Sequence, residues 1–395
     1  MHGAVKPKEA NGLMRHAFQC WLATILVGCS VSTNPASEPA VTGTHAGEPS
    51  AATKDAGEKV SLVDARAHVS DADAEADAGR DVYLLPPKWS GGSPDVIESG
   101  NEAVSLAIDE SHVFWQGTGG SLFACPLAGC GTAAPVLLSS LIGPSAGLQT
   151  LSASNGVAVF VSELGVDLTT LTYADPDAST ALTVTGVGSS IGAVVTDATN
   201  LYVSSAVETD AGGYNLTIAS CPLAGPCSTP VVLVSGSSFG AMFVADGELY
   251  FATYDEQPTL SAVSVHGGAS RTVCSESPDG GYVLSDVVSL VVAGGYAYFT
   301  SEDDPSSIYQ CPTSGMGSPS LYLHDYAPYA LATDGQDLYW TNYVPGTGTV
   351  ATCAVGPKCT SPFTVADNQD SPYAIAASPS SVFWTTPGAI YRADR

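Results

Sequence analysis

The chain has 395 residues, with 39 Asp and Glu against 12 Lys and Arg, and a formal net charge of −27 at pH 7. Proteins that bind nucleic acid need a basic surface that displaces counterions from phosphate, so the composition excludes that class of partner. The same charge excludes electrostatic attraction to an anionic membrane surface. Any membrane contact must therefore come from a covalent anchor.

Residues 1–28 resemble a bacterial lipoprotein signal peptide. A short basic stretch precedes an apolar run, AFQCWLATILVGCS, that begins at Ala17. The run is too short for a permanent transmembrane helix, which needs about 20 apolar residues. It ends in LVGC, which resembles the lipobox, and the resemblance implies that Cys29 carries the lipid. Because Ser30 follows, it also implies an outer-membrane anchor. The alternative is an ordinary secretory signal that happens to contain a cysteine.

Residues 29–80 differ in composition from the rest of the chain. Ala, Ser, Thr, Pro, Asp and Glu dominate, and no aromatic residue occurs between Trp21 and Tyr83. Such a segment has too little apolar surface to offset the entropy lost on ordering. We therefore predict an acidic, disordered tether over 29–80 and a folded domain over 81–395.

The folded part contains a repeated five-residue pattern. It occurs as HVFWQ, VAVFV, NLYVS, ELYFA, AYFTS, LYWTN and VFWTT. When the seven strings are aligned, one bulky apolar position recurs every 41 to 48 residues. That spacing is the length of one β-propeller blade. The aligned residues are Trp115, Phe160, Val203, Phe251, Phe299, Trp340 and Trp384.

Each repeat has room for four short strands. A small-apolar strand precedes each string, often across an Asp-Gly, Asn-Gly or Gly-Gly turn that signals a hairpin, and two more strands follow. We predict an all-β fold, a seven-bladed propeller of four-stranded antiparallel blades, with six or eight blades as the alternatives. The last repeat ends at its third strand, AIYRADR. Residues 95–98 are expected to supply the missing strand and to close the ring, which removes free sheet edges.

The repeats resemble known propeller families over about residues 90–395. LYWTNY is similar to the YWTD repeat of lipoprotein-receptor propellers, although those have six blades, and the blades also resemble NHL-like repeats. The order of signal, tether and propeller resembles the propeller lipoproteins of myxobacteria. The resemblance implies a bacterial protein that is anchored outside the cytoplasm, on the periplasmic side or at the cell surface.

Three short cysteine pairs recur at one position of the repeat, between the third and fourth strands. A structural zinc site needs two such pairs that meet, and a redox motif needs C-x-x-C, so a disulfide across each hairpin is the interpretation that remains. Cys311 has the same position in the fifth blade without a near partner. Cys274 is its candidate mate, which would join two blades. The three short pairs are Cys125 with Cys130, Cys221 with Cys227, and Cys353 with Cys359.

One end of the central channel is predicted to carry carboxylates and tyrosines. In propellers this mouth is formed by the loops between the second and third strands and by the links between blades. Calcium prefers six to eight oxygen ligands, so Asp255, Asp303 and Asp304 are the candidates for a calcium site. The alternative is that these loops only keep the domain soluble. The candidate ligand-binding residues are Tyr254, Asp255, Glu256, Glu302, Asp303, Asp304, Tyr326, Tyr329 and Tyr373.

The sequence favours binding over catalysis. After residue 90 the basic residues are Arg271, Lys358, Arg392 and Arg395, whereas propeller enzymes gather His, Arg or Lys at the mouth. We assign no catalytic residue and no cofactor other than calcium, and we expect a monomer. The predicted role is a non-enzymatic binding or scaffold module for an envelope protein or polysaccharide. The alternative is a calcium-dependent or carboxylate-based hydrolase or lyase that acts on extracytoplasmic sugars or lactones.

Overall fold

The computed structural model describes residues 93–395, except 101, 118–119, 141–149, 164–168, 176–179, 185–189, 209–213, 224–226, 228, 237, 256 and 277–282. The chain divides into two units between Arg80 and Asp81, and every described residue belongs to the second unit. The predicted signal peptide, lipidation at Cys29 and tether lie outside the described residues. Within the part that is described, no helix is long and apolar enough to cross a membrane.

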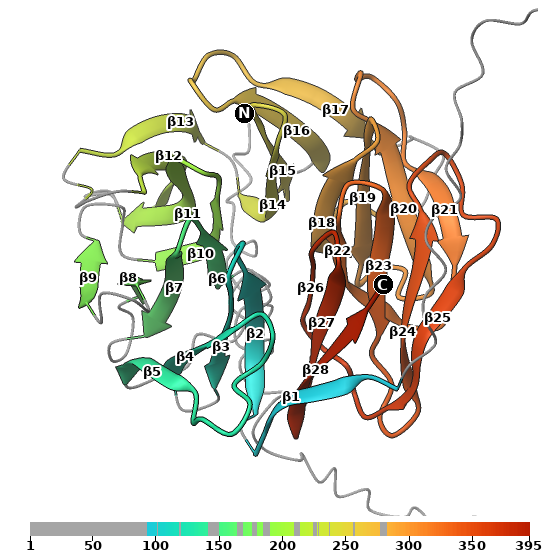
Figure 1. Ribbon diagram of the computed structural model, residues 1–395. Coiled ribbons are helices and arrows are strands. Elements are labelled where there is room, and N and C mark those ends of the chain that lie inside the picture. Colours follow the sequence, from blue (N-terminus) through green and yellow to red (C-terminus); the bar gives the residue numbers. More distant parts are fainter. Residues whose placement is uncertain are drawn as a thin grey trace, which may run out of the picture. The chain divides into compact units, whose positions relative to one another are not determined.

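The strands of the described residues form seven four-stranded antiparallel sheets (Figure 1). The first four are β2 (Ala103–Ile108), β3 (His112–Gly117), β4 (Ser121–Pro126) and β5 (Val136–Ser140); β6 (Leu151–Ser154), β7 (Val157–Glu163), β8 (Thr169–Asp175) and β9 (Thr180–Val184); β10 (Ser190–Thr196), β11 (Asn200–Glu208), β12 (Tyr214–Pro222) and β13 (Val231–Ser235); and β14 (Phe239–Ala245), β15 (Glu248–Thr253), β16 (Thr259–Ser264) and β17 (Arg271–Ser275). The remaining three are β18 (Val287–Ala293), β19 (Tyr296–Ser301), β20 (Ser307–Pro312) and β21 (Ser320–His324); β22 (Pro328–Thr333), β23 (Asp337–Asn342), β24 (Gly348–Ala354) and β25 (Phe363–Gln369); and β26 (Ile375–Ala377), β27 (Ser381–Thr386), β28 (Ala389–Asp394) and β1 (Asp95–Ser99). We number them blades one to seven in this order.

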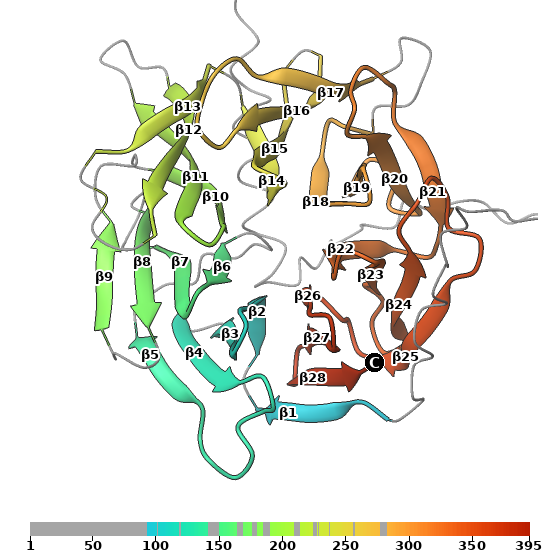
Figure 2. The ribbon, with the colours of Figure 1, turned by 45° about the horizontal axis from the view of Figure 1, so that its top comes forward.

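The sheets are arranged radially around a common axis, and the last one is completed by the first strand of the described chain (Figure 2). β1 pairs antiparallel with β28, with Asp95 opposite Arg392 and Ser99 opposite Ala389. The predicted closing strand is thereby confirmed. The prediction of an all-β propeller with four-stranded antiparallel blades is confirmed as well.

Buried apolar residues hold neighbouring blades together. Among the described residues they form seven clusters, and each cluster joins two adjacent blades, blade seven and blade one included. Burial of apolar area stabilises a fold by about 25 cal/mol per Å². Because every interface of the ring contains such a cluster, the ring is held by packing as well as by the strand that closes it.

The repeated apolar position has one structural role in all seven blades. It lies on the second strand, opposite an apolar residue of the first strand, and these first-strand residues line a cavity of about 140 Å³ at the centre of the ring. Residues opposite each other in an antiparallel pair project from the same face of the sheet, and each of these pairs belongs to the cluster that its blade shares with the preceding blade. The pairs are Leu106 with Trp115, Leu151 with Phe160, Val194 with Val203, Met242 with Phe251, Leu290 with Phe299, Leu331 with Trp340, and Ile375 with Trp384.

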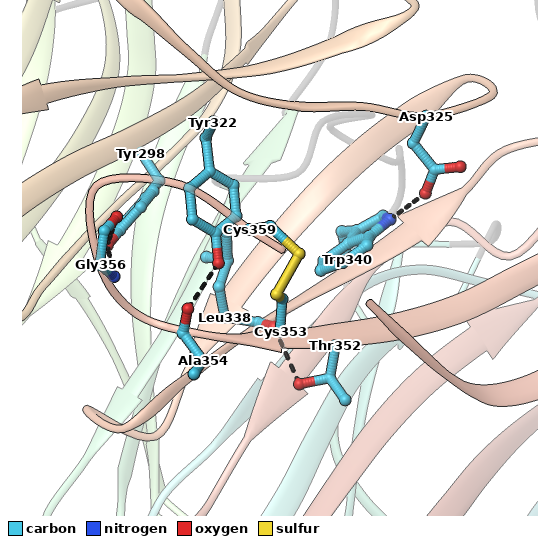
Figure 3. Close-up of a disulfide and its surroundings, with 10 residues drawn as sticks. All are labelled: Tyr298, Tyr322, Asp325, Leu338, Trp340, Thr352, Cys353, Ala354, Gly356 and Cys359. Atoms are coloured by element: carbon cyan, nitrogen blue, oxygen red, sulfur yellow. Dashed lines mark hydrogen bonds between the residues drawn. A yellow bond between two sulfur atoms is a disulfide. The ribbon is translucent and has the colours of Figure 1, made fainter. Parts of the chain in front are cut away.

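The three short disulfides lie in the packing between blades. Cys353 bonds with Cys359, and their turn meets Tyr298 and Tyr322 of blade five (Figure 3). The Tyr322 hydroxyl donates to the carbonyl of Ala354 at 2.7 Å. Each predicted hairpin disulfide is formed, and each lies in a cluster that it shares with the preceding blade. The other two bonds are Cys125 with Cys130 and Cys221 with Cys227.

A fourth disulfide crosses a blade boundary. Cys274, on the outer strand of blade four, is bonded to Cys311, on the third strand of blade five. The two Cα atoms are 6.2 Å apart, and both residues are fully buried. Beside them the Ser275 amide donates to the carbonyl of Gly317. The predicted pairing of Cys274 with Cys311 is confirmed, and it ties two blades covalently.

Candidate functional site

One end of the ring carries the second-to-third strand loops and the links between blades. At this end Asp286 and Glu302 face each other, because Val287 begins β18 directly opposite Ser301, the last residue of β19. The Glu302 amide donates to the Asp286 carbonyl at 3.0 Å. We call this end the mouth, defined here by Asp286, Glu302, Asp303, Tyr329, Tyr343 and Tyr373.

Three carboxyl groups cluster at the mouth on blade five. Glu302 and Asp303 are exposed, whereas Asp286 is half-buried. Burial raises the pKa of Asp286 to about 6, and the charges of Glu302 and Asp303 and a hydrogen bond with Glu302 add to this effect. The Asp303 carboxylate also accepts a hydrogen bond from the Ser285 hydroxyl. The cluster therefore holds one carboxyl that gains a proton near neutral pH beside two exposed carboxyls.

Three tyrosines pack against each other on the two following blades. The ring of Tyr329 lies 5.0 Å from that of Tyr373 and 5.5 Å from that of Tyr343, and the last two rings are 5.9 Å apart in an edge-on arrangement. The Tyr329 hydroxyl donates to that of Tyr373 at 3.2 Å. Tyr343 is 43% exposed, while its two partners are half-buried. Tyr343 therefore presents its ring to solvent, and the rings of Tyr329 and Tyr373 pack against it.

The carboxyl cluster and the tyrosine trio are neighbours. The Thr300 hydroxyl of blade five donates to the Tyr329 carbonyl of blade six at 2.6 Å, and this contact joins the strands that carry the two groups. Burial raises the pKa of Tyr329 and of Tyr373, and the negative charge of Glu302 contributes in both cases. The mouth thus combines exposed carboxylates with an aromatic surface across three consecutive blades.

Two of the predicted residues on blade four have structural partners. The Tyr254 hydroxyl donates to the Val287 carbonyl at 2.9 Å, and its ring fills the space where a side chain at Gly240 would lie. Tyr254 therefore packs blade four against blade five. Asp255 is exposed and accepts a long hydrogen bond, 3.4 Å, from the Ser238 amide. Glu256 lies outside the described residues.

Asp304 does not join the carboxyl cluster, contrary to the prediction. Its carboxylate accepts hydrogen bonds from Ser306 and from the Tyr309 hydroxyl, at 2.6 and 2.5 Å. Although burial acts in the opposite direction, these hydrogen bonds lower the pKa of Asp304 to about 2. It stabilises the turn before β20. Tyr326 is 75% exposed, and its amide donates to its neighbour Asp325.

The predicted calcium ligands do not form a metal-binding group. Asp255, Asp303 and Asp304 each interact with a different partner, as described above. In the part of the chain that the structure describes, no three His, Cys, Asp or Glu side chains are grouped closely enough to hold a metal ion. The adjacency of Asp303 and Asp304 was misleading because their carboxylates belong to different hydrogen-bond networks.

The arginines of the propeller are all engaged away from the mouth. Arg271 pairs with Glu248 on blade four. Arg392 pairs with Asp394, and Arg395 pairs with the buried carboxylates of Asp334 and Asp337. The one lysine after residue 90, Lys358, follows β24 at the opposite end of its blade. The negative charge of the mouth is therefore not neutralised by any Lys or Arg of the described chain.

Sequence reasoning missed two residues of the mouth. Asp286 is the last residue of the link before β18, and Tyr343 directly follows the repeat LYWTN. A signal for both was present, because a residue just before a first strand and one just after a second strand meet at the same end of a blade. Because the first and second strands of a blade pair antiparallel, the residue before the first strand lies next to the residue after the second strand.

Comparisons with known proteins identify the fold. No protein-family model and no curated protein matches the chain. Three solved structures of similar fold are an oligogalacturonate lyase from Vibrio parahaemolyticus (13% identity, TM-score 0.54, 76% of this chain and 91% of that chain), a puromycin-hydrolyzing peptidase from Mycobacterium tuberculosis (15%, 0.54, 75% and 51%), and the Cps50 (Swd1) β-propeller domain from Myceliophteria thermophila (10%, 0.52, 77% and 100%). The chain is a β-propeller. At these identities the likeness concerns the fold alone and assigns no activity.

Proposed function

We propose that this chain is a non-enzymatic binding or scaffold module of the bacterial cell envelope, with the mouth as its ligand site. The observation that supports it is the combination at the mouth of exposed carboxylates, Glu302 and Asp303, with the partly exposed ring of Tyr343. A propeller supplies such loops on a rigid scaffold, which limits the entropy lost when a ligand binds.

The chemistry of the mouth fits two ligand classes. Carboxylates without a counter-cation accept hydrogen bonds from sugar hydroxyls and pair with the ammonium or guanidinium groups of a protein. An exposed tyrosine ring stacks on the apolar face of a sugar or on an arginine. A polysaccharide or a protein with basic side chains therefore fits the mouth, whereas a phosphate-rich ligand does not.

The proposed location follows from the first 80 residues. The lipobox-like sequence that ends at Cys29 would place a lipid at the start of the mature chain, and residues 29–80 would then serve as a tether between that lipid and the propeller. Four disulfides support this location, because such bonds persist in oxidising compartments outside the cytoplasm. The propeller would then be presented to ligands in the envelope rather than in the cytoplasm.

The test combines a binding readout with a turnover readout on the same samples. The full chain is mixed with envelope polysaccharides and with peptidoglycan fragments, and thermal unfolding is followed together with the release of new reducing ends. A ligand that binds only the folded state raises the unfolding midpoint. The proposal expects a raised midpoint without product. Steady product release that is lost in Glu302→Gln would assign an enzymatic function instead.

One observation favours a second candidate, a carboxylate-based hydrolase or lyase. Asp286, with its pKa raised to about 6, lies beside Glu302, and such an asymmetric pair resembles an acid and a base. Glycosidases use two carboxyl groups in this way. Against this candidate, no Arg or Lys of the described chain lies near the pair to stabilise an anionic intermediate. Product release that falls with Asp286→Asn would support it.

A further inference from the structure

A groove separates the outer parts of blades six and seven. It has a volume of about 360 Å³ and is walled on one side by β25 and on the other by the end of β28. Phe363, at the start of β25, lines it and is 47% exposed, a large value for a Phe on a strand. Asp367 lies further along the same wall and is exposed.

The chain enters the propeller at this groove. Ser93 and Pro94, which lead into β1, are themselves part of its lining. β1 begins close to β25 in both ribbon views, which differ by 45° (Figures 1 and 2). The segment that immediately precedes Ser93 is therefore the part of the chain that reaches the groove most easily.

We propose that residues 83–89 of the same chain dock into this groove, with Trp89 against Phe363 and Lys88 beside Asp367. Trp89 precedes Ser93 by four residues, which an extended chain spans in about 13 Å. The stretch YLLPPKW contains the only aromatic residues between Trp21 and Ser93. The groove combines the apolar side chains of Phe363 and Val365 with the carboxylate of Asp367, and the adjacent stretch supplies apolar, aromatic and basic side chains that match this mixture.

Charge and backbone chemistry agree with this occupant. The described residues provide no hydrogen bond or ion pair to the Asp367 carboxylate, and Lys88 supplies a cation in a chain that has few. Among the strands that the structure describes, β25 has a single neighbour, β24, and its other edge has no strand partner among them. Pro86 and Pro87 lack backbone N–H groups, which suits a segment that covers a sheet edge without extending the sheet.

The test is limited trypsin digestion of the full chain, because Lys88–Trp89 is itself a trypsin site. Arg66–Ala67, in the tether, is the internal reference bond. Cleavage in a segment that opens and closes rapidly follows the population of the open form. We expect cleavage after Lys88 to be slower than after Arg66 by at least about tenfold, which corresponds to a docked population above about 90%.

Two matched variants assign the protection to the groove. Phe363→Asp is expected to raise cleavage after Lys88 to the rate seen after Arg66. Val231→Asp changes the equivalent first residue of an outer strand on blade three, which is 58% exposed, and must leave Lys88 protected. Circular dichroism confirms that both variants fold. Acrylamide quenching of Trp89, measured in a Trp21→Phe background, is a second readout, since Trp115, Trp340 and Trp384 are fully buried.

The outcomes separate the proposal from its alternatives. Equal rates of cleavage after Lys88 and after Arg66 in the unchanged chain would overturn the proposal. It would also be overturned if Phe363→Asp left both the protection of Lys88 and the low quenching of Trp89 unchanged. If cleavage after Lys88 rises equally in Phe363→Asp and in Val231→Asp, the assignment to this groove is overturned. Protection that disappears on dilution would assign the groove to a second copy of the chain rather than to residues 83–89.

Discussion

The indole Nε1 of Trp340 donates a hydrogen bond to Oδ2 of Asp325 at 2.6 Å (Figure 3). Trp340 is on the second strand of blade six, and Asp325 follows the outer strand of blade five, so the bond fixes one blade to the link that leads into it. Blade seven repeats the arrangement, with Trp384 donating to Gln369 of blade six at 2.9 Å. In both cases the acceptor precedes the tryptophan by 15 residues.

Replacing Asp325 is expected to destabilise the fold strongly. Its carboxylate also accepts a hydrogen bond from Asn342 Nδ2 at 2.9 Å, so Asp325→Ala leaves the Trp340 indole N–H without its acceptor and removes one of the two acceptors of Asn342 Nδ2, the other being Thr349 Oγ1. The expected loss in the free energy of unfolding is about 2–3 kcal/mol, measured by chemical denaturation. Glu110→Ala, at an exposed hairpin turn, is the control and should change stability by less than about 0.5 kcal/mol. Equal effects in the two variants would contradict the assigned role.

The disulfide between blades should contribute more stability than a hairpin disulfide. The bond between Cys274 and Cys311 closes a loop with a sequence separation of 37, against 6 for Cys353 and Cys359. On the chain-entropy estimate the longer loop is worth about 4 kcal/mol and the shorter about 2 kcal/mol. Paired Cys→Ala variants compared by thermal unfolding test this order. A larger loss from the hairpin pair would show that loop entropy is not the dominant effect.

Stability should depend on pH through Asp286. Its pKa is raised from 3.8 to about 6, so the folded state binds this proton more tightly than the unfolded state does. The penalty for ionisation is absent below about pH 4 and complete above about pH 6. Asp286→Asn should therefore be more stable than the unchanged chain at pH 8, by about 1–2 kcal/mol after allowance for screening, and equally stable at pH 4. A stability difference that does not vary with pH would contradict this prediction.

Arg395 is expected to be a strong stabilising contact between the last two blades. Its guanidinium pairs with Asp334 and Asp337 of blade six, and all three side chains are buried. Arg395→Ala leaves two carboxylates buried without a cation, which costs about 3–5 kcal/mol when a buried pair is broken in this way. Urea denaturation measures the loss. Asp334→Asn combined with Asp337→Asn in the same variant should recover part of it, and a failure to recover any would point to lost packing rather than lost charge.

The blades could be predicted from the sequence because their pattern is local. Each second strand repeats a bulky apolar residue at a fixed spacing, which marks one blade per repeat and the buried face of that strand. The pairing of Trp115 opposite Leu106, and of Trp384 opposite Ile375, is a register that the structure adds to this pattern. The disulfide between Cys274 and Cys311 could also be predicted, since these are the two cysteines of the propeller that remain once the three short pairs are assigned.

The mouth was predicted only in part because side-chain partners are not local. Asp303 and Asp304 are adjacent in the sequence, yet one joins Asp286 and the other caps a turn with Tyr309. Tyr254 has the exposed-loop position of a ligand contact but reaches the carbonyl of Val287 on the next blade. These outcomes depend on rotamers and on neighbouring blades, which a repeat pattern does not specify.

The most direct test of the central claim compares mouth variants in thermal unfolding with peptidoglycan fragments and envelope polysaccharides as the probes. The account predicts that at least one probe raises the midpoint of the unchanged chain, and that Glu302→Gln combined with Tyr343→Ala abolishes this shift. Tyr296→Ala, at a hairpin turn on the opposite end of blade five, should leave the shift intact. A shift that persists in the double variant, or one that Tyr296→Ala removes equally, would contradict the claim that the mouth binds the ligand.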